Sequence, residues 1–297
     1  MSLVVFIQQL LNGLSLGSLY ALIAIGYTMV YGILQLINFA HGDIFMIGAY
    51  IAFFTVVMFK IPWVLAAILT IILTAGVGMI VERIAYRPLR DEPRISMLIT
   101  AVGVSFFIEN LAIVVLGARP KGFPVPVLMG KNYDLGGLRI TGVSIWVPLI
   151  SLGLLALLLY IIYHTKIGMA MRAVAKDIEA TRLMGINVDK VIAYTFALGS
   201  GLAAAGGMLW ACKHPQIQPL MGMYPGWKAF TAAVVGGIGN ITGAMIGGLL
   251  IGLVEILSVA FAPNLSGYRD AFVFALLIIF LLVKPTGLMG ETQKEKV

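Results

Sequence analysis

Long apolar runs separated by short polar stretches dominate this chain. The runs come close to or exceed the roughly 20 helical residues that are needed to cross the hydrocarbon core of a bilayer. They lie at about 5–34, 43–59, 62–81, 95–116, 143–163, 191–211, 242–261 and 268–283. This pattern predicts an all-α polytopic membrane protein with about eight to nine transmembrane helices.

The first run, residues 5–34, is longer than one straight crossing requires. It contains Gly13, Gly17 and Gly26, so we expect a tilted or kinked helix, or a helix preceded by an interfacial turn. The N-terminus has neither the basic region nor the small-residue cleavage site of a secretory signal. We therefore expect the first helix to be retained in the mature protein.

A shorter apolar run at about 227–238 lies between the sixth and seventh long runs. It belongs to the segment GWKAFTAAVVGGIGNITG, residues 226 to 243, in which glycines and Asn240 interrupt the apolar character. Because the run is too short to span comfortably, it predicts a broken or re-entrant segment near 227–240. Discontinuous helices of this kind expose backbone groups along substrate paths.

Composition excludes several classes of protein. The chain is 60% apolar and 11% charged, and its mean hydropathy is +1.01, so residues 1–297 form a single transmembrane domain with little room for a soluble one. The net charge of +7 reflects cations in membrane-flanking loops rather than nucleic-acid binding. A single cysteine, Cys212, excludes an intrachain disulfide. His41, His164 and His214 do not stand at the spacing of metal ligands, so we expect no metal site.

The Lys and Arg residues predict the orientation of the chain. Alternating crossings place four arginines on the same side as residues 164–190: Arg83, Arg87, Arg90 and Arg94. The tail lysines join that side if the run at 227–238 crosses or counts as half a span: Lys284, Lys294 and Lys296. That side then holds twelve of the 20 Lys and Arg residues and is predicted to be cytoplasmic, with the C-terminus.

Residues 117–142 are predicted to lie on the opposite side of the membrane. The segment carries four cations and also Pro120, Pro124 and Pro126. We interpret it as an ordered extracytoplasmic loop where a partner rests, or as a plain connector between two spans.

The least apolar stretch is residues 164–190, HTKIGMAMRAVAKDIEATRLMGINVDK. Five cations are interleaved with Asp177, Glu179 and Asp189, and Ala, Met and Leu at helical spacing form an apolar stripe. This pattern predicts a short amphipathic helix outside the membrane that docks against another protein. A solvated charged linker is the alternative, although a linker needs no apolar stripe.

Small residues recur at every fourth position in two stretches. These are Gly239, Gly243 and Gly247, continued by Gly248 and Gly252, and Gly199, Ala203 and Gly207. Such spacing lets helix backbones approach closely in lipid. The residues pack helices tightly inside the subunit, or they form a face shared with a second copy of the fold.

Polar residues in or beside apolar runs are candidates for a translocation path. NFAHGD places Asn38, His41 and Asp43 around a turn-forming glycine, where a broken helix or an ordinary solvated loop could lie. Glu109, Asn110 and Glu255 lie well inside predicted spans. A carboxylate in hydrocarbon is costly, so both glutamates should face the bundle interior. Together with Asn240, these residues line a path or bond to neighbouring helices.

No catalytic constellation is present in the sequence. It contains neither G-x-S-x-G nor H-E-x-x-H, and it has no phosphate-binding loop of the Walker A type. We therefore do not expect an enzyme. If the chain moves a solute with ATP, another polypeptide must hydrolyse the nucleotide.

The segment MRAVAKDIEATRLMGINVDK resembles the cytoplasmic loop of bacterial ABC-importer permeases, more narrowly those of high-affinity branched-chain amino-acid uptake systems. Further matches are NGLSLGSLYALIAIGYTMVYGILQLINFAHGDIFMIGAY, GWKAFTAAVVGGIGNITGAMIGGLLIGLVE and GYRDAFVFALLIIFLLVKPTGLMG. The resemblance covers nearly the whole chain, and NFAHGD together with KPTGLMG is quite specific. The compact length is similar to the shorter of the two paired permeases.

The resemblance implies a heteromeric importer of leucine, isoleucine and valine in the bacterial inner membrane. It implies a second permease, two cytoplasmic ATPases that bind ATP, and a periplasmic or lipid-anchored binding protein; this chain itself would carry no cofactor. Glu179, Ala180, Thr181 and Gly185 fall where the EAA-x-x-x-G coupling motif lies, although Thr181 departs from it and no I-x-L-P follows. The implied ATPase-coupling residues are Arg172, Lys176, Asp177, Glu179, Ala180, Arg182 and Gly185.

Other functions remain compatible with the sequence. The same machine could carry urea, short amides, other amino acids or a sugar. A proton- or ion-coupled carrier would use Glu109 and Glu255 as its relay. An intramembrane enzyme around His41 and Asp43 is the remotest alternative, because no nucleophile or metal partner can be named.

Overall fold

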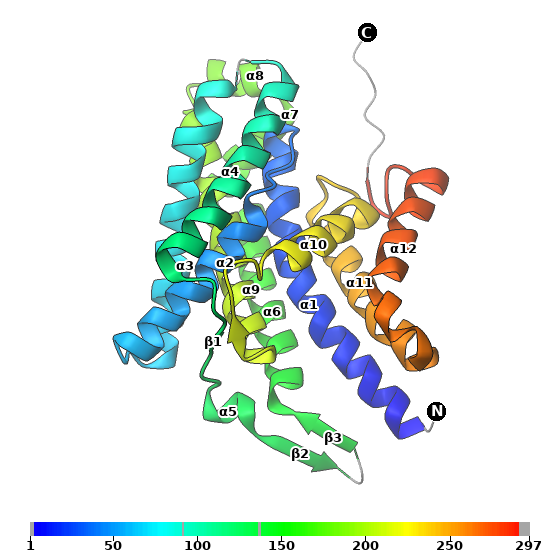
Figure 1. The fold of residues 1–297 in the computed structure, drawn as a ribbon. Helices are drawn as coiled ribbons and strands as arrows, with labels where there is room; N and C mark the ends of the chain where they lie inside the picture. The colour runs from blue at the N-terminus through cyan, green and yellow to red at the C-terminus, as the bar shows by residue number, and fades with distance from the viewer. Residues whose placement is uncertain (1–2, 91, 136–137, 291–297) are drawn as a thin grey trace.

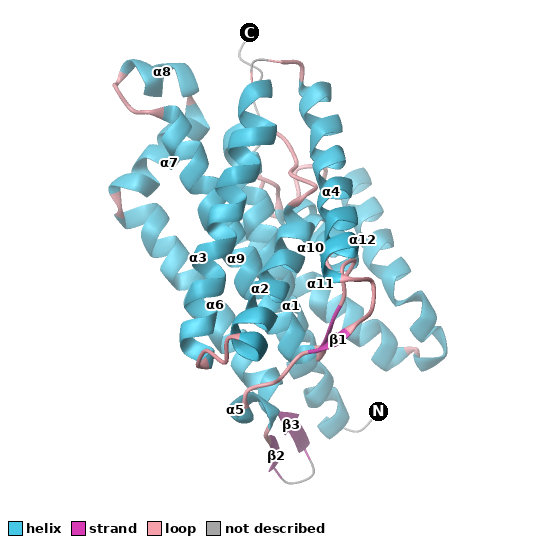
Figure 2. Cartoon of the chain, turned by 60° about the vertical axis from the view of Figure 1, so that its left-hand side comes forward, coloured by secondary structure: helices cyan, strands magenta, loops and turns pink. Residues whose placement is uncertain are grey.

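The computed structural model describes residues 3–90, 92–135 and 138–290, and most of them are helical (Figures 1 and 2). Within these residues, eight helices are long and apolar enough to cross a membrane. They are Leu3–Leu34, His41–Met58, Trp63–Leu89, Ile95–Leu116, Gly142–His164, Val188–Lys213, Ile241–Phe261 and Pro263–Val283. The predicted all-α polytopic fold is therefore confirmed.

Several of these spans join elements of different helical type, and shorter elements connect them. The first half of the chain contains α1 (Leu3–Leu34), α2 (His41–Phe53), η1 (Phe54–Met58), α3 (Trp63–Val81), η2 (Glu82–Tyr86), η3 (Arg87–Leu89), α4 (Arg94–Leu116), β1 (Lys121–Gly122), α5 (Val127–Gly130), β2 (Asn132–Leu135) and β3 (Leu138–Thr141). The second half contains α6 (Gly142–His164), α7 (Lys166–Lys176), α8 (Ile178–Leu183), α9 (Val188–Lys213), β4 (Gln216–Ile217), α10 (Met223–Gly236), α11 (Ile241–Phe261), η4 (Pro263–Tyr268) and α12 (Arg269–Val283).

The two ends of the helix bundle carry different elements (Figure 1). One end, called the α7–α8 end below, holds α7, α8 and the end of α12, whereas the opposite hairpin end holds the start of α1 and the β2–β3 hairpin. Arg87 and Arg90, which follow α3, both form ion pairs with Asp189 beside α8. The predicted grouping of these arginines with residues 164–190 is thus confirmed. Lys294 and Lys296 lie outside the described residues.

The described residues of the predicted loop at 117–142 pair and pack with other parts of the chain. Lys121–Gly122 of β1 pair antiparallel with Gln216–Ile217 of β4, and the ring of Phe123 packs on that of Trp63 at 5.6 Å. These contacts tie the loop to the body of the bundle, and the β2–β3 hairpin projects from its far end (Figure 2).

Helices α1 and α9 form the centre of the bundle. Both are largely buried, whereas α4 and α12 expose most of their apolar surface. In a membrane protein an exposed apolar face meets lipid or another subunit. The outer faces of α4 and α12 are therefore available for contact with lipid or with another subunit.

Helix α1 is continuous over 32 residues. At 1.5 Å per residue it is about 48 Å long, which exceeds the roughly 30 Å hydrocarbon core, so it must tilt or project beyond that core. Its glycines allow close packing: Gly17 lies on the backbone of Leu249, and the His41 ring fills the space beside Gly26. The helix runs unbroken through its glycines, and an interfacial turn before it would fall outside the described residues.

Helix α10 has 14 residues and is too short to span a membrane. Its N-terminus lies near the middle of the bundle and its C-terminus faces the α7–α8 end (Figure 1). Gly237 and Gly239, with φ of 108° and 95°, form the turn that leads into α11. The segment predicted near 227–240 is thus a short discontinuous helix. It begins at Met223 and includes Pro225, which is tolerated in a first helical turn.

The fourfold glycine spacing packs helices inside this subunit. A side chain on Gly252 would collide with the backbone of Gly17, and one on Gly247 with the Ala232 carbonyl. Likewise, one on Gly207 would collide with the carbonyl of Phe45. Of the two interpretations of this spacing, the contacts support tight packing within the chain.

Candidate functional site

Two interrupted helices meet inside the bundle. Residues 35–40 leave the helical conformation after α1, with φ of 55° at Gln35, and α2 starts at His41. There Gly42 lies against Gly222 and Gly226 at the start of α10, so closely that a side chain on Gly222 would collide with the Gly42 carbonyl. Only glycine permits such an approach of two backbones. The N-termini of α2 and α10 therefore meet within the membrane region.

Asp43 lies beside this crossing and is 3% exposed. The Ser105 hydroxyl of α4 donates to its Oδ2 at 2.5 Å. Glu109 stands one helical turn further along α4, and both carboxyl groups line the same small cavity. The pair thus forms a polar centre between α2 and α4.

A small cavity of about 50 Å³ adjoins these carboxyl groups. Its other walls are aromatic: Tyr27, Phe39, Trp227 and Phe230. The Phe39 and Trp227 rings lie 5.5 Å apart, and Tyr27 and Phe230 pack edge to face at 6.2 Å. This combination of acids and aromatic faces suits an ammonium group that carries an apolar substituent. A cavity of this size must widen before it can admit an amino acid.

Asn38 and His41 lie in the same region but are not in the wall of this cavity. The Tyr86 hydroxyl donates to Oδ1 of Asn38 at 2.7 Å, and the His41 ring packs edge-on against Tyr27 at 4.8 Å. Among the described residues, Nε2 of His41 has no hydrogen-bond partner. The residues of NFAHGD are therefore buried in a broken-helix element, not in a solvated loop.

Glu255 belongs to a separate, buried ionic cluster. Its Oε1 lies 2.8 Å from Nζ of Lys228 and 3.1 Å from Nε of Arg269, and its Oε2 accepts from the Tyr20 hydroxyl at 2.8 Å. Lys228 also pairs with Asp270 at 2.7 Å. Two cations balance two carboxylates, so this cluster ties α1, α10, α11 and α12 together.

Sequence reasoning missed these partners of Glu255. Lys228 is a cation inside the short apolar run, and Arg269 and Asp270 stand at the start of the last span. A charge inside an apolar segment requires a partner, and that requirement is the signal that could have linked Lys228 to Glu255. Glu109 and Glu255 belong to different clusters, and this separation offers no support for a relay between them.

Asn110 and Asn240 have local roles in the described structure. Asn110 is exposed, and its side-chain amide donates to the Phe106 carbonyl at 2.7 Å. Asn240 caps α11, because its Oδ1 accepts from the Gly243 amide at 2.9 Å and its Nδ2 donates to the Met289 carbonyl at 3.0 Å. Neither residue joins the carboxyl pair of Asp43 and Glu109.

The amphipathic segment at the α7–α8 end is two helices, not the single helix predicted. Asp177 leaves the helical conformation and caps α8 by accepting from the Ala180 amide at 2.9 Å. At the other end of α8, Gly185 has φ of 79°, a conformation that glycine adopts without strain. The segment therefore turns sharply between α7 and α8 and again after α8.

The predicted coupling residues divide into two groups. Arg172 and Lys176 of α7 face inward, and the Arg172 guanidinium lies 5.2 Å above the Tyr163 ring. Glu179, Ala180 and Arg182 of α8 are exposed. Beside them Leu183 is 90% and Met184 81% exposed, an apolar pair that sequence reasoning did not single out. Two apolar residues directly before Gly185 were the available signal.

Ion pairs anchor the start of α9, which follows α8 along the chain. Arg90 is 15% exposed, and its Nη1 lies 2.6 Å from Oδ1 of Asp189, while Arg90 also pairs with the buried Glu82 and Arg87 also pairs with Asp189. Because Asp189 lies in the first turn of α9, the cluster links the segment after α8 to the α3–α4 connection.

No group of three or more His, Cys, Asp and Glu residues that could hold a metal ion occurs among the described residues. Beside the helix crossing, the small cavity presents the carboxyl groups of Asp43 and Glu109 and four aromatic faces.

Comparison with known proteins gives concordant matches. Residues 9–281 match the family described as the branched-chain amino acid transport system / permease component. The chain is 44% identical to the high-affinity branched-chain amino acid transport system permease proteins LivH of Salmonella typhimurium and Escherichia coli, over 98% of this chain and 98% of each relative. It is 43% identical to BraD of Pseudomonas aeruginosa, which carries the same description, again over 98% of both chains.

Proposed function

Because this chain belongs to the branched-chain amino acid transport permease family, we propose that it is a transmembrane subunit of an ATP-driven importer for leucine, isoleucine and valine. It forms the translocation path with a second permease subunit. Two cytoplasmic ATPase subunits bind and hydrolyse ATP, and a periplasmic or lipid-anchored protein delivers the amino acid. The chain itself carries no cofactor and is not an enzyme.

The observation that carries this proposal is the exposed helix α8. An apolar pair, Leu183 and Met184, stands free at its end, and exposed apolar side chains on a short helix suit insertion into a groove of another protein. Asp189, in the first turn of α9 that follows this helix, forms ion pairs with Arg87 and Arg90. Closure of an ATPase pair around α8 would therefore move the spans to which it is tied.

The α7–α8 end accordingly faces the cytoplasm. The cations Arg87, Arg90, Arg172 and Lys176 gather there, as the excess of positive charge in cytoplasmic loops requires. The end of α12 lies on this side too, and the β2–β3 hairpin lies on the opposite side (Figure 1). The hairpin end receives the loaded binding protein.

Transport follows alternating access. The contact of Gly42 with Gly222 and Gly226 separates the two halves of the bundle, and its opening enlarges the cavity beside Asp43. The carboxyl groups of Asp43 and Glu109 receive the ammonium group of the amino acid, and the aromatic walls receive its aliphatic side chain. Movement of helix α8 with the ATPases determines when this contact opens and the cavity widens.

Purification of the tagged chain from native membranes, with mass spectrometry of the proteins that accompany it, tests the proposal. We expect an ATPase with a Walker motif and a second permease. Leu183→Asp should reduce the recovered ATPase at least tenfold, because a charge in an apolar contact loses roughly 1.4 kcal/mol or more. Val127→Asp is the matched control, since Val127 is 81% exposed at the opposite end.

Equal recovery of the ATPase with both variants would contradict the role of α8. The cargo is tested separately, by measuring which amino acids the recovered binding protein binds. A preference of that protein for urea, an amide or a sugar would still support an importer but would contradict the proposed amino-acid substrate.

A further inference from the structure

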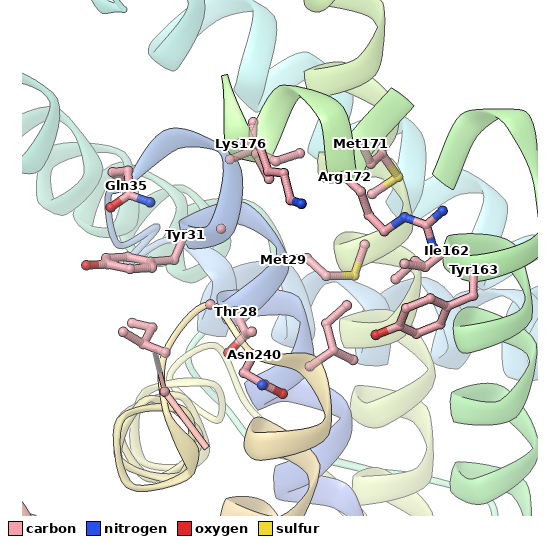
Figure 3. A pocket seen from close by; sticks show the side chains of 17 residues that line it. Thr28, Met29, Tyr31, Gln35, Ile162, Tyr163, Met171, Arg172, Lys176 and Asn240 are labelled. Carbon is pink, nitrogen blue, oxygen red and sulfur yellow. The ribbon is translucent and has the colours of Figure 1, made fainter. Parts of the chain in front are cut away.

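An open cavity of about 530 Å³ lies at the α7–α8 end of the molecule (Figure 3). Helices α1, α6 and α7 and the turn before α11 enclose it. It is about ten times larger than the cavity beside Asp43, and an amino acid or a lipid headgroup fits inside it. Neither the transport path nor the exposed face of α8 accounts for it.

Two cations stand on one wall of this cavity. Arg172 and Lys176 are four residues apart in α7 and so share one face of that helix. Figure 3 shows both side chains at the rim of the open space. Among the described residues no carboxylate lies within ion-pair distance of either cation. Within the described part of the chain, the positive charge on this wall is therefore not compensated by a carboxylate.

Thr28 of α1 lies on the opposite wall and is fully buried, at 0% exposure. Its hydroxyl has no hydrogen-bond partner among the described residues, although a threonine inside a helix usually donates to the carbonyl four residues earlier. Buried hydroxyl groups are seldom left without a partner. Beside a cavity, such a hydroxyl is a candidate hydrogen-bond partner for a ligand atom.

The third polar feature is the N-terminus of α11. This helix has 21 residues and begins at the cavity, where Asn240 caps it. Helix N-termini attract anions because their first amides are unpaired and the helix dipole is positive there. Met29 and Met171 add apolar surface between these polar groups. The site therefore favours an amphipathic anion.

We propose that this cavity binds a small oxyanion with an aliphatic part, held by Arg172, Lys176 and Thr28, and that its occupation restrains α7. The carboxylate of a free amino acid and the phosphate of a lipid headgroup both have this chemistry. A bound anion would link α7 to α1 and to the start of α11. The restraint would reach α8 and slow ATP turnover; this last step rests on the proposed importer function.

Binding is measured on the complex as it purifies from native membranes, without the binding protein, using radiolabelled leucine and excess unlabelled competitor. Unlabelled leucinol, which retains the ammonium group and side chain but lacks the carboxylate, should compete at least tenfold more weakly than leucine. The double variant Arg172→Gln with Lys176→Gln should raise the dissociation constant of leucine at least tenfold. Lys166→Gln removes a cation from the same helix outside the cavity and should change it less than twofold.

Native mass spectrometry of the same complex in bilayer discs of phosphatidylcholine, with and without phosphatidylglycerol, tests the lipid source. Retention of phosphatidylglycerol by the unsubstituted chain, and its loss in the double variant, would identify a headgroup phosphate as the ligand. Thr28→Val provides a second variant, since valine keeps the shape of threonine and removes only the hydroxyl. It should weaken binding of the same ligand severalfold.

Leucine binding that is lost in the substituted chains assigns the site to the free amino acid, and retained lipid assigns it to the membrane. Binding of neither probe, or binding that is equal in the double variant, Thr28→Val and Lys166→Gln, would overturn the proposal. Absence of an ATPase from the purified complex would instead contradict the proposed importer. The two failures are therefore distinguishable.

Discussion

Lys228 shows how a single residue depends on distant partners. Its side chain is 5% exposed and reaches Oε1 of Glu255 at 2.8 Å. In a low-dielectric interior each of these charges requires partners of opposite sign. The pair joins α10 to α11 across 27 positions of sequence.

Lys228→Met should destabilise the protein strongly, because it leaves Glu255 without one of its cations. Removing one partner of a buried ion pair costs roughly 3–5 kcal/mol of folding free energy. The combination of Lys228→Met with Glu255→Gln should lose less than the sum of the two single variants. Thermal unfolding of the detergent-solubilised complexes measures this, and strict additivity would refute the coupling.

At the scale of elements, α8 is short and is defined by its two ends. Asp177 caps its first turn and Gly185 closes it with φ of 79°. A helix of six residues gains little from its own hydrogen bonds, since nucleation is costly. Its orientation toward a partner therefore depends on these two residues.

Gly185→Ala should loosen the end of α8, because alanine adopts a positive φ only at a cost of roughly 1–2 kcal/mol. We expect the transport rate to fall severalfold while the chain still reaches the membrane. Gly185→Asn is the control, as asparagine tolerates this conformation. Uptake of labelled leucine by membrane vesicles compares the two, and equal losses would argue against a conformational role.

Hydropathy was sufficient to predict the spans, because each run meets the same physical requirement for length and apolarity. It could not predict the break between α7 and α8. The apolar stripe of residues 164–190 continues through that break, and only the competition of the Asp177 side chain for backbone amides ends α7. The end of α7 is determined there by local capping, and the hydrophobic periodicity of a sequence carries no information about capping.

At the scale of the whole molecule, four of the predicted path residues fall in three separate places. Asp43 and Glu109 lie at the helix crossing, Glu255 lies in the ionic cluster of α10 to α12, and Asn240 lies near the α7–α8 end. Sequence reasoning identified the polar residues within the apolar runs but not these groupings. The groupings depend on how non-adjacent helices pack, which a single sequence does not specify.

Asp43→Asn and Glu109→Gln should each reduce the uptake of leucine at least tenfold and leave the recovered ATPase unchanged. The reason is the loss of a charge-assisted hydrogen bond to the ammonium group, worth roughly 1.5–3 kcal/mol. Asn110→Leu alters the neighbouring residue, which is exposed, and should transport normally. A loss of uptake in Asn110→Leu alone would move the path to the outer face of α4.

The glycine crossing of α2 and α10 has a consequence for leakage. Gly42, Gly222 and Gly226 meet through backbone atoms, and no backbone hydrogen bond joins Gly42 to Gly222 in the described chain. Dispersion contacts of this kind contribute only about 0.1–0.2 kcal/mol per atom pair. The crossing is held by packing and not by a backbone hydrogen bond, so we predict that the proposed ATPase subunits determine how tightly it closes and that a permease purified without them leaks.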